Sequence, residues 1–480
     1  MGRIKNLASE TAIYGLGTII PRLINYFLVI PHTRIFLPEA YGIITNLYAY
    51  AGFLNVVLLF GMETAFFRFA NKPGADRNRV FQLAQTVVVG IALPVSLVIG
   101  LNASFLAKTL GFAGHPEYLQ YLAGIVLLDA LVAIPFARWR QEKKAILFSI
   151  AKVTNVLVLV GLNYLFLFSR WFEPARGVGY VLLANLLANA LFLIFLGKSL
   201  ISWRPAWNQE QTGHMLRYAY PVMLMGLAGM TNELFSRICI EWWWPVGFQG
   251  HSAQYALGVF GACYKYAVFM NLVVMAFRYA AEPFFFSNAN DKHSPALFAK
   301  VNHYFIVAGC FIVLAVTVNL DWLKWMLRSP AYHEGLDIVI LLLIAYLFMG
   351  VYYNFSAWFK ITDRTHFGTW FTALGALITI GGNYFLIPIA GYYGSAWVTL
   401  ACSGFMMVAC YTFGQRYFPV PYQVGKGLAY LLFACGLIGL SNTWAFHAQW
   451  QTTMYHLFLC LIYLVVAWLA ERKNVSSNAT

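Results

Sequence analysis

Apolar stretches of about 20 residues recur along the whole sequence, and they restrict the fold more than any other feature. A helix of that length crosses a hydrocarbon layer of about 30 Å. Inside a bilayer every backbone N–H and C=O must be paired within its own segment, so a single crossing segment must be a helix. Charged residues make up 10% of the 480 residues, against about 25% in soluble domains. The chain is predicted to be an all-α polytopic membrane protein.

Fourteen such segments can be placed along the chain, and turns such as Pro73-Gly74 separate them. No interval between them is long enough for a soluble domain, and the longest polar interval, near residues 200–216, is interpreted as a linker. The predicted membrane helices lie near residues 11–31, 42–62, 82–101, 118–138, 147–168, 177–199, 217–241, 253–277, 300–320, 335–356, 366–387, 394–413, 426–441 and 453–470.

The distribution of basic residues predicts the orientation of the chain. With the N-terminus inside, the inner loops and termini hold 23 of the 32 Lys and Arg residues, and the outer loops hold six. Cytoplasmic loops of membrane proteins carry such an excess. We therefore expect a membrane location with both termini in the cytoplasm. These loops explain the net charge of +14, so no nucleic-acid partner is expected.

The sequence contains an internal duplication. Residues Tyr48–Val57 return as Tyr264–Val273, with six of ten positions identical at an offset of 216. After a slip of three residues the two copies continue to match at offsets of 219 and 220. An ordered series of matches at nearly one offset is not explained by chance. The further matched pairs include Glu63 with Glu282, Ala70-Asn71 with Ala289-Asn290, Trp139 with Trp358, Phe148 with Phe367, and Asn163 with Asn383.

The second copy begins six predicted spans after the first. Six is even, so both copies enter the membrane in the same orientation. Parallel repeats of this kind are related by an axis along the membrane normal, and we expect the two lobes to enclose a central cavity. The predicted domains are an N-terminal six-helix lobe (1–205), a C-terminal six-helix lobe (206–416), and two additional helices with a cytoplasmic tail (417–480). We expect a monomer.

Arg22 lies near the middle of the first predicted span. An arginine at that depth costs about 2.5–3.5 kcal/mol, so its side chain should face protein or water. Thr18, Arg22 and Asn25 share one face of the predicted helix. We predict that Arg22 and Asn25 line the cavity. A structurally paired arginine, or one that reaches toward the interface, is the alternative.

Two further cations lie within predicted spans, Arg237 and Lys265. Arg237 follows Glu233 by four residues, so an ion pair within one helix is the alternative to a role in the cavity. Glu233 is also a candidate for coupling to an ion. Lys265 stands where the first copy has Ala49, which suggests a functional position, although lysine also reaches interfaces easily. Arg34 is predicted to mark the outer mouth of the cavity.

Asp129 lies in the middle of the fourth predicted span. It is the best candidate for a carboxylate that responds to a proton or a cation, and hydrogen bonding in the core is the alternative. Glu63 and Glu282 occupy equivalent positions near the cytoplasmic side. They are interpreted as structural latches that pair with Arg68 or Arg278.

The sequence lacks the signatures of enzymes. It has no H-E-x-x-H motif, no Walker A motif and no G-x-S-x-G elbow. Its ten histidines have no metal-ligand spacing. The seven cysteines lie in or beside apolar runs without a C-x-x-C motif and are interpreted as packing residues. We expect no catalysis, no cofactor and no metal site.

Several motifs of the chain resemble those of one transporter family. A pattern near the end of the repeat is the most specific of them, an asparagine followed by L-I-P-x-x-G-x-x-G-S-A. The residues that carry the resemblance are Lys5-Asn6-x-Ala8-Ser9-x-Thr11, Pro38-Glu39-Ala40-Tyr41-Gly42, Leu216-x-Tyr218-x-Tyr220-Pro221, and Asn383 with Leu386-Ile387-Pro388-x-x-Gly391-x-x-Gly394-Ser395-Ala396. The chain is similar here to the multidrug/oligosaccharidyl-lipid/polysaccharide (MOP) exporter superfamily, in its polysaccharide (Wzx-like) branch.

This resemblance implies a flippase of MATE/MurJ-like fold that moves a polyprenyl-diphosphate-linked oligosaccharide to the outer leaflet by alternating access. The glycan would be a repeat unit of O-antigen, capsule or exopolysaccharide. Membrane lipids, and H⁺ or Na⁺ as a coupling ion, are the other implied partners. Arg22, Arg237 and Lys265 would contact the diphosphate.

Three alternatives to this function remain at the level of sequence. One is a lipid II flippase like MurJ, and another is a cation-coupled multidrug exporter. Drug exporters of the superfamily usually have twelve spans and acidic cavity residues, and this chain differs on both counts. The third is a membrane glycosyltransferase or polymerase, for which clustered carboxylates or a long external loop would be expected.

Overall fold

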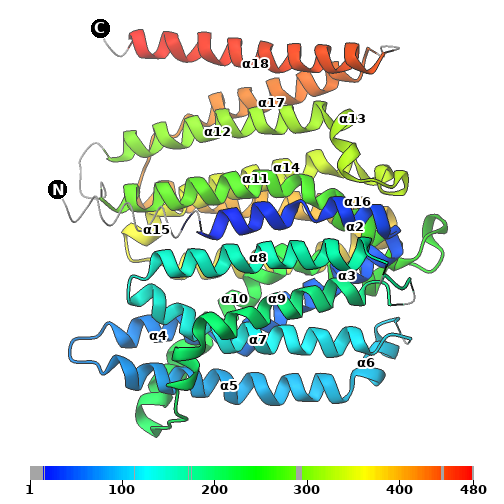
Figure 1. The fold of residues 1–480 in the computed structure, drawn as a ribbon. Coiled ribbons are helices and arrows are strands. Elements are labelled where there is room, and N and C mark those ends of the chain that lie inside the picture. Colours follow the sequence, from blue (N-terminus) through cyan, green and yellow to red (C-terminus); the bar gives the residue numbers. More distant parts are fainter. Residues whose placement is uncertain are drawn as a thin grey trace. The chain divides into compact units, whose positions relative to one another are not determined.

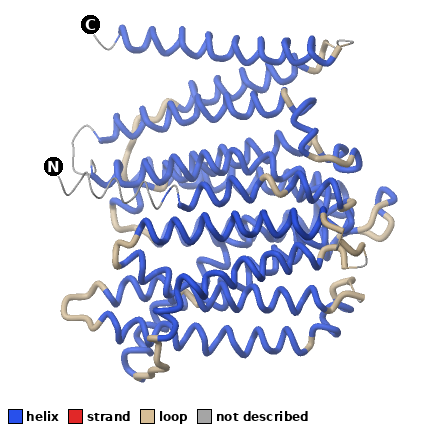
Figure 2. The backbone as a smooth tube through the Cα atoms, in the orientation of Figure 1, coloured by secondary structure: helices blue, strands red, loops and turns tan. Residues whose placement is uncertain are grey.

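The computed structural model describes residue 15 and residues 17–477, except 113, 171, 175, 288–293 and 445–447. In this part of the chain the regular elements are helices and none is a strand (Figure 2). The predicted all-helical fold is therefore confirmed. The N-terminal motif from Lys5 to Thr11 and the repeat positions Ala289-Asn290 lie outside the described residues. The chain forms two compact units, Met1–Gly261 and Ala262–Thr480.

The first unit contains the helices that Figure 1 draws in blue to green, up to the start of α11. A helical segment at residues 17–26 precedes α2. The elements are α2 (Val29–Ile35), α3 (Pro38–Leu59), α4 (Met62–Ala70), α5 (Arg77–Leu101), α6 (Ala103–Thr109), α7 (Glu117–Gln141), α8 (Ala145–Phe168), α9 (Gly179–Ile201), α10 (Gln209–Trp243), the short turn η1 (Phe248–Gly250) and the beginning of α11 (Ala253–Ser287).

The second unit contains the rest of α11 and the helices that follow it. Within it α14 packs against α16, while α12 packs against α14, α17 and α18. The elements are α12 (Ser294–Val318), α13 (Leu320–Leu323), η2 (Lys324–Met326), η3 (Pro330–Gly335), α14 (Ile338–Phe355), α15 (Ala357–Ile361), α16 (His366–Tyr417), α17 (Val424–Ser441) and α18 (Gln449–Ser477).

The first predicted span is not one continuous helix. The helical segment at residues 17–26 ends in a turn at Phe27 and Leu28, and α2 begins at Val29. The amides of Phe27 and Leu28 bond three residues back, at 3.1 and 3.2 Å. Pro31 explains the break, because its ring has no N–H and clashes with the carbonyl four residues earlier, that of Phe27. Arg22 and Asn25 therefore lie just before an interruption of the helix.

The three-residue slip in the repeat has a structural counterpart. In the first copy, Phe60 and Gly61 adopt left-handed backbone angles (φ of 49° and 68°) and separate α3 from α4. The second copy has three more residues at this point, and α11 continues without a break. Three residues are close to one helical turn. In the first copy, which is three residues shorter, the helix breaks between α3 and α4. In the second copy the three additional residues form nearly one more turn, and α11 continues through this position.

The two copies of the repeat meet at a close crossing of α3 and the start of α11. A Cβ on Gly42 would lie 1.9 Å from the carbonyl oxygen of Gln254, and one on Gly258 would lie 1.9 Å from that of Pro38. Gly258 and Gln254 are the positions 216 residues after Gly42 and Pro38. The crossing is therefore symmetric, with each glycine against the backbone of the other copy. Only glycine permits this approach.

Equivalent side chains of the two copies also make equivalent local contacts. Asn163 and Asn383 are fully buried, and each donates its side-chain N–H to the carbonyl four residues earlier, at 2.8 and 2.7 Å. Trp139 packs in one cluster with Phe148, and Trp358 lies near Phe367, with ring centres 5.2 Å apart. The duplication is thus visible in the packing of each unit. The lobe boundaries (1–205, 206–416 and 417–480) stay a prediction.

The late sequence motif forms a reversal within α16. Gly391 has a φ of 57° and a ψ of −138°, which interrupts the helical path after Pro388. A Cβ on Gly394 would lie 2.5 Å from the carbonyl oxygen of Leu386, so a side chain cannot fit there. The Ser395 hydroxyl donates to the Asn383 side-chain oxygen at 2.6 Å. The motif therefore connects two predicted membrane helices, which together make up the element α16.

Eleven described helices are long and apolar enough to cross a membrane. The 52-residue α16 counts as one of them although it reverses at Gly391. Neither the interrupted first span nor α10, whose C-terminal half carries Asn232, Glu233 and Arg237, is among the eleven. The count of fourteen stays a prediction. The expected linker at 200–216 is shorter in the structure, because Asn208 caps α10 through the Gln211 amide at 2.8 Å.

The crossing at Gly42 predicts a large effect for a single methyl group. Gly42→Ala should destabilise the protein by about 1–3 kcal/mol, because the Cβ meets backbone that cannot rotate away. Gly90→Ala in α5 is the matched control, since nothing lies within 4 Å of a Cβ placed there. Thermal unfolding of both purified variants measures the difference. Equal unfolding temperatures would show that α3 and α11 are not in close contact.

Candidate functional site

Arg22 and Asn25 are exposed on the helical segment at residues 17–26. They are three residues apart and share one face of this segment. Arg34 is exposed in the last turn of α2, and its guanidinium lies 5.5 Å from the ring centre of Phe168. A cation at the C-terminal end of a helix is favourable for the helix dipole. Arg34 thus has a local structural role whatever its role in transport.

The other predicted cations lie on α10 and α11. Arg237 is partly buried on α10 beside the buried Ser236, and Glu233 one turn earlier is exposed. Lys265 is partly buried on α11 and belongs to the second unit. Substrate contact by Arg22, Asn25, Arg34, Arg237 and Lys265, and coupling by Glu233, stay predictions.

Asp129 lies at the centre of a polar network in the first unit. It stands midway along α7, twelve residues from either end. The side-chain amide of Asn55 on α3 donates to Asp129 Oδ2 at 3.2 Å, and that of Asn189 on α9 donates to Asp129 Oδ1 at 2.9 Å. Each carboxylate oxygen therefore receives a hydrogen bond from a different helix.

The network continues onto α8 and α9 through further asparagines. The amide of Asn155 on α8 donates to Asn189 Oδ1 at 3.2 Å and to the Ala188 carbonyl at 2.8 Å. One turn from Asn189, the amide of Asn185 donates to the Tyr48 hydroxyl at 2.7 Å. Four helices, α3, α7, α8 and α9, are thus joined by side-chain hydrogen bonds.

Lys152 supplies the positive charge of this network. It lies seven residues into α8, and its ammonium stands over the rings of Phe136 and Phe192 at 4.5 and 4.7 Å. It interacts electrostatically with both Asp129 and Glu63. The sequence interpretation placed Lys152 with the cytoplasmic loop residues and did not connect it with Asp129. The missed signal is its position five residues inside the predicted span.

Glu63 has a different partner from the two predicted ones. Its carboxylate forms an ion pair with Arg140 at the end of α7. Arg68 instead lies over the ring of Tyr218 at 4.2 Å, and Arg278 lies over that of Tyr353 at 4.8 Å. The ion pair of Glu63 with Arg140 in the first copy therefore joins α4 to α7. Arg140 is 77 residues away in sequence, and no local pattern connects the two residues.

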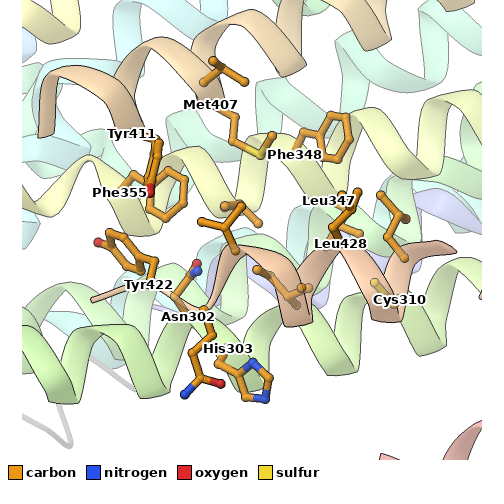
Figure 3. Close-up of a pocket in the computed structure, with 17 residues that line it drawn as sticks. Asn302, His303, Cys310, Leu347, Phe348, Phe355, Met407, Tyr411, Tyr422 and Leu428 are labelled. Atoms are coloured by element: carbon orange, nitrogen blue, oxygen red, sulfur yellow. The ribbon is translucent and has the colours of Figure 1, made fainter. Parts of the chain in front are cut away.

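The second unit contains an apolar cavity of about 200 Å³ between α12, α14, α16 and α17 (Figure 3). Asn302, His303, Tyr411, Tyr422 and Gln423 place polar groups around it. The other lining residues are Ile306, Cys310, Leu347, Phe348, Val351, Phe355, Met407, Val408, Val424, Gly427, Leu428 and Leu431. Sequence reasoning did not predict this cavity, because its walls come from four helices that each look like ordinary membrane spans.

A partly buried carboxylate holds the last helix beside this cavity. Glu471 on α18 lies 2.8 Å from the His303 Nε2 of α12, and it accepts a hydrogen bond from the Tyr430 hydroxyl of α17, also at 2.8 Å. Tyr463 donates to the Val307 carbonyl at 2.9 Å. These bonds join α17 and α18 to α12.

No metal site was found in the part of the chain that the structure describes: no group of three or more His, Cys, Asp or Glu side chains is suitably placed there. The seven cysteines are free thiols.

The fold is that of transporters. It is similar to the lipid II flippase MurJ in an inward closed conformation, with a TM-score of 0.72, 14% identity, and coverage of 96% of this chain and 99% of that one. An inward-facing multidrug resistance MATE family transporter of the MOP superfamily gives a TM-score of 0.64 and 14% identity over 89% of this chain and all of that one. The MATE multidrug transporter DinF-BH gives a TM-score of 0.58 and 16% identity, over 86% of this chain and 95% of that one.

The sequence itself matches the family described as "Polysaccharide biosynthesis protein" over residues 33–295, which is more than half of the chain. The chain belongs to this family. Its eleven long apolar helices are those of a multi-pass membrane protein. A search of curated proteins finds no match to the sequence.

The exposed face of Arg22 and Asn25 predicts contact with water rather than lipid. In a protein whose native cysteines are replaced, Arg22→Cys and Asn25→Cys should react with a water-soluble maleimide, because the reactive thiolate forms only in water. Val98→Cys is the control, since Val98 is 59% exposed on the apolar helix α5. Labelling of Val98→Cys as fast as Arg22→Cys would contradict a water-lined face.

Proposed function

We propose that this protein is a flippase for a polyprenyl-diphosphate-linked oligosaccharide, moving it from the cytoplasmic to the outer leaflet of a bacterial inner membrane. The family match, to polysaccharide biosynthesis proteins, supports a glycan substrate. The lipid diphosphate is inferred from the charges and the cavity. A repeat unit of O-antigen, capsule or exopolysaccharide is the expected cargo.

The observation that carries this proposal is the sign of the accessible charge. Arg22 is exposed beside the helix break of the first span, at a depth where lipid would exclude a cation. By contrast, the carboxylate of Asp129 is enclosed by two amides and Lys152. At these two positions the base is exposed and the acid is enclosed, the reverse of what export of a cationic drug would favour. The arrangement here suits an anionic group, and a guanidinium binds phosphate oxygens with two parallel hydrogen bonds.

The cavity of the second unit supports the lipid part of the substrate. Its polar residues Asn302, His303 and Gln423 lie near the beginnings of α12 and α17, which are cytoplasmic in the predicted orientation. Its apolar residues include Cys310, which lies further along α12, and Leu347, which lies midway along α14 (Figure 3). A hydrocarbon chain that enters from the cytoplasmic leaflet would match this order, with its polar end at the interface and its apolar part inside.

A matched pair of tryptophan variants tests the role of the cavity. Leu428 lines the cavity, whereas Leu432, one turn further on α17, does not line it. Leu428→Trp should fill the space and weaken binding of polyprenyl diphosphate about tenfold, which corresponds to about 1.4 kcal/mol. Leu432→Trp should leave binding unchanged. Native mass spectrometry of the purified protein with added polyprenyl diphosphate gives both affinities, and equal affinities would remove the cavity from the proposal.

Substitution of Arg22 tests the proposed function directly. Arg22→Ala should abolish export of the glycan while protein abundance stays near normal. Arg22→Lys should keep part of it, because a point charge still attracts phosphate but lacks the planar fork. Surface glycan is measured in a strain that lacks the native copy, together with the amount of membrane protein.

Two outcomes of this experiment would contradict the proposal. Full export by Arg22→Ala would show that the arginine does not contact the substrate. Equal loss of the protein and of the glycan would show that it stabilises the fold. Drug resistance on overexpression, without any effect on glycan export, would favour the multidrug alternative. Rescue of a strain that lacks its lipid II flippase would favour the MurJ-like alternative.

A further inference from the structure

We infer that Asp129 is a proton-binding site with a built-in counter-cation: Lys152 balances the ionised carboxylate, and Asn55 accepts a hydrogen bond from the protonated one. This inference deepens the proposed function only in its last step, the link to export. The site itself is argued from the geometry of four helices in the first unit.

The ionised form of Asp129 has a hydrogen-bond donor for each oxygen and a cation nearby. Each carboxylate oxygen accepts one amide hydrogen bond, from Asn55 at 3.2 Å and from Asn189 at 2.9 Å. Lys152 interacts with the same carboxylate and is held over two phenylalanine rings. A charge in the middle of the membrane persists only with such partners. The positive charge of Lys152 balances the negative charge of the carboxylate.

The protonated form of Asp129 also has a potential partner, the side-chain oxygen of Asn55. Asn55 Oδ1 is buried and has no hydrogen-bond partner among the described residues. When a proton from water binds Asp129 Oδ2, that oxygen becomes a donor and no longer needs the Asn55 N–H. Rotation of the Asn55 amide by about 180° then turns Oδ1 toward the new O–H, because the two amide ends are nearly equal in shape. The unpartnered oxygen thus gains a donor.

The duplicated copy gives an internal comparison. At the offset of 219 that joins Trp139 to Trp358 and Phe148 to Phe367, Asp129 corresponds to Phe348 and Lys152 corresponds to Phe371. Both members of the charged pair are therefore replaced by the same apolar residue. Asn55, by contrast, is kept as Asn271. Loss of one partner alone would leave an uncompensated buried charge. The two charges are accordingly present together in one copy and absent together in the other.

The charged surroundings connect the site to the cytoplasmic end of the unit. Four helices contribute titratable or charged groups near Asp129: Tyr48 on α3, Glu63 on α4, Arg140 on α7 and Lys152 on α8. From α9 only neutral asparagines face it. Lys152 is attracted by Asp129 and by Glu63. Protonation of Asp129 removes the first attraction, so Lys152 would then compete with Arg140 for Glu63 and loosen the contact between α4 and α7.

A proton fits this site better than a metal cation. Hard cations take about six or more oxygen ligands in proteins. Here both carboxylate oxygens face amide N–H groups, and an ammonium already occupies the neighbourhood. A metal ion would have to displace all three, whereas a proton needs only the rotation of Asn55.

Infrared difference spectra between low and high pH test the inference on the purified full chain in lipid nanodiscs. The wild-type protein should show the carbonyl band of a protonated carboxyl group that Asp129→Asn removes. Glu173→Gln is the control, because Glu173 is exposed and pairs with Arg176 on the surface. Lys152→Gln should move the midpoint of the Asp129 band to higher pH by about one unit or more, since an opposite charge is lost.

Asn55→Leu examines the rotation separately. It should move the band to higher frequency, because the carboxyl O–H loses its acceptor.

A band that survives Asp129→Asn, or a midpoint that Lys152→Gln leaves unchanged, would overturn the inference. Disappearance of the band on addition of Na⁺ at constant pH would show a metal-cation site instead. If Asp129→Asn does not fold, the Lys152→Gln midpoint still decides. None of these spectra depends on glycan export, so a failure here is distinct from a failure of the proposed function.

Discussion

Hydrocarbon offers no hydrogen bonds, and this constraint governs the structure from its backbone to its polar core. It requires helices, and it requires a partner for every polar side chain placed between them. The buried asparagines satisfy it locally: Asn163 and Asn383 each bond to their own helix and then to a neighbouring side chain, His32 and Ser395 respectively. Asp129 satisfies it with amides from two other helices. Polar contacts therefore mark where helices must meet.

Much of the fold was predictable because membrane helices and internal repeats leave direct marks in the sequence. The all-helical class and the late turn motif needed only hydropathy and the spacing of Gly391 and Gly394. The break at Phe27 and the pairing of Glu63 with Arg140 were not predicted. The first depends on how one proline acts within an apolar run. The second joins residues on different helices, and a single sequence does not contain that information. Lys152 did have a signal in the sequence, its position five residues inside a predicted span, but its proximity to Asp129 did not.

The two units use equivalent positions for different chemistry. Asp129 lies in a network of amides and a cation, whereas Phe348, its counterpart by register, lines an apolar cavity. Lys152 lies over two aromatic rings, and its counterpart Phe371 packs among other phenylalanines. One half of the chain thus holds a charge pair where the other half holds hydrocarbon surface. A proton in the first and a lipid chain in the second are the ligands that these environments favour.

The symmetric crossing at Gly42 and Gly258 has a genetic consequence. In a homodimer every mutation at a two-fold contact occurs twice, so both sides change together and most changes are lost. In a fused duplication each side has its own codon, and one side can vary while the other keeps the contact intact. Gene fusion therefore preserves the contact between the two copies and allows the rest of each half to diverge. An acid and a base could then be retained, or acquired, in one half alone.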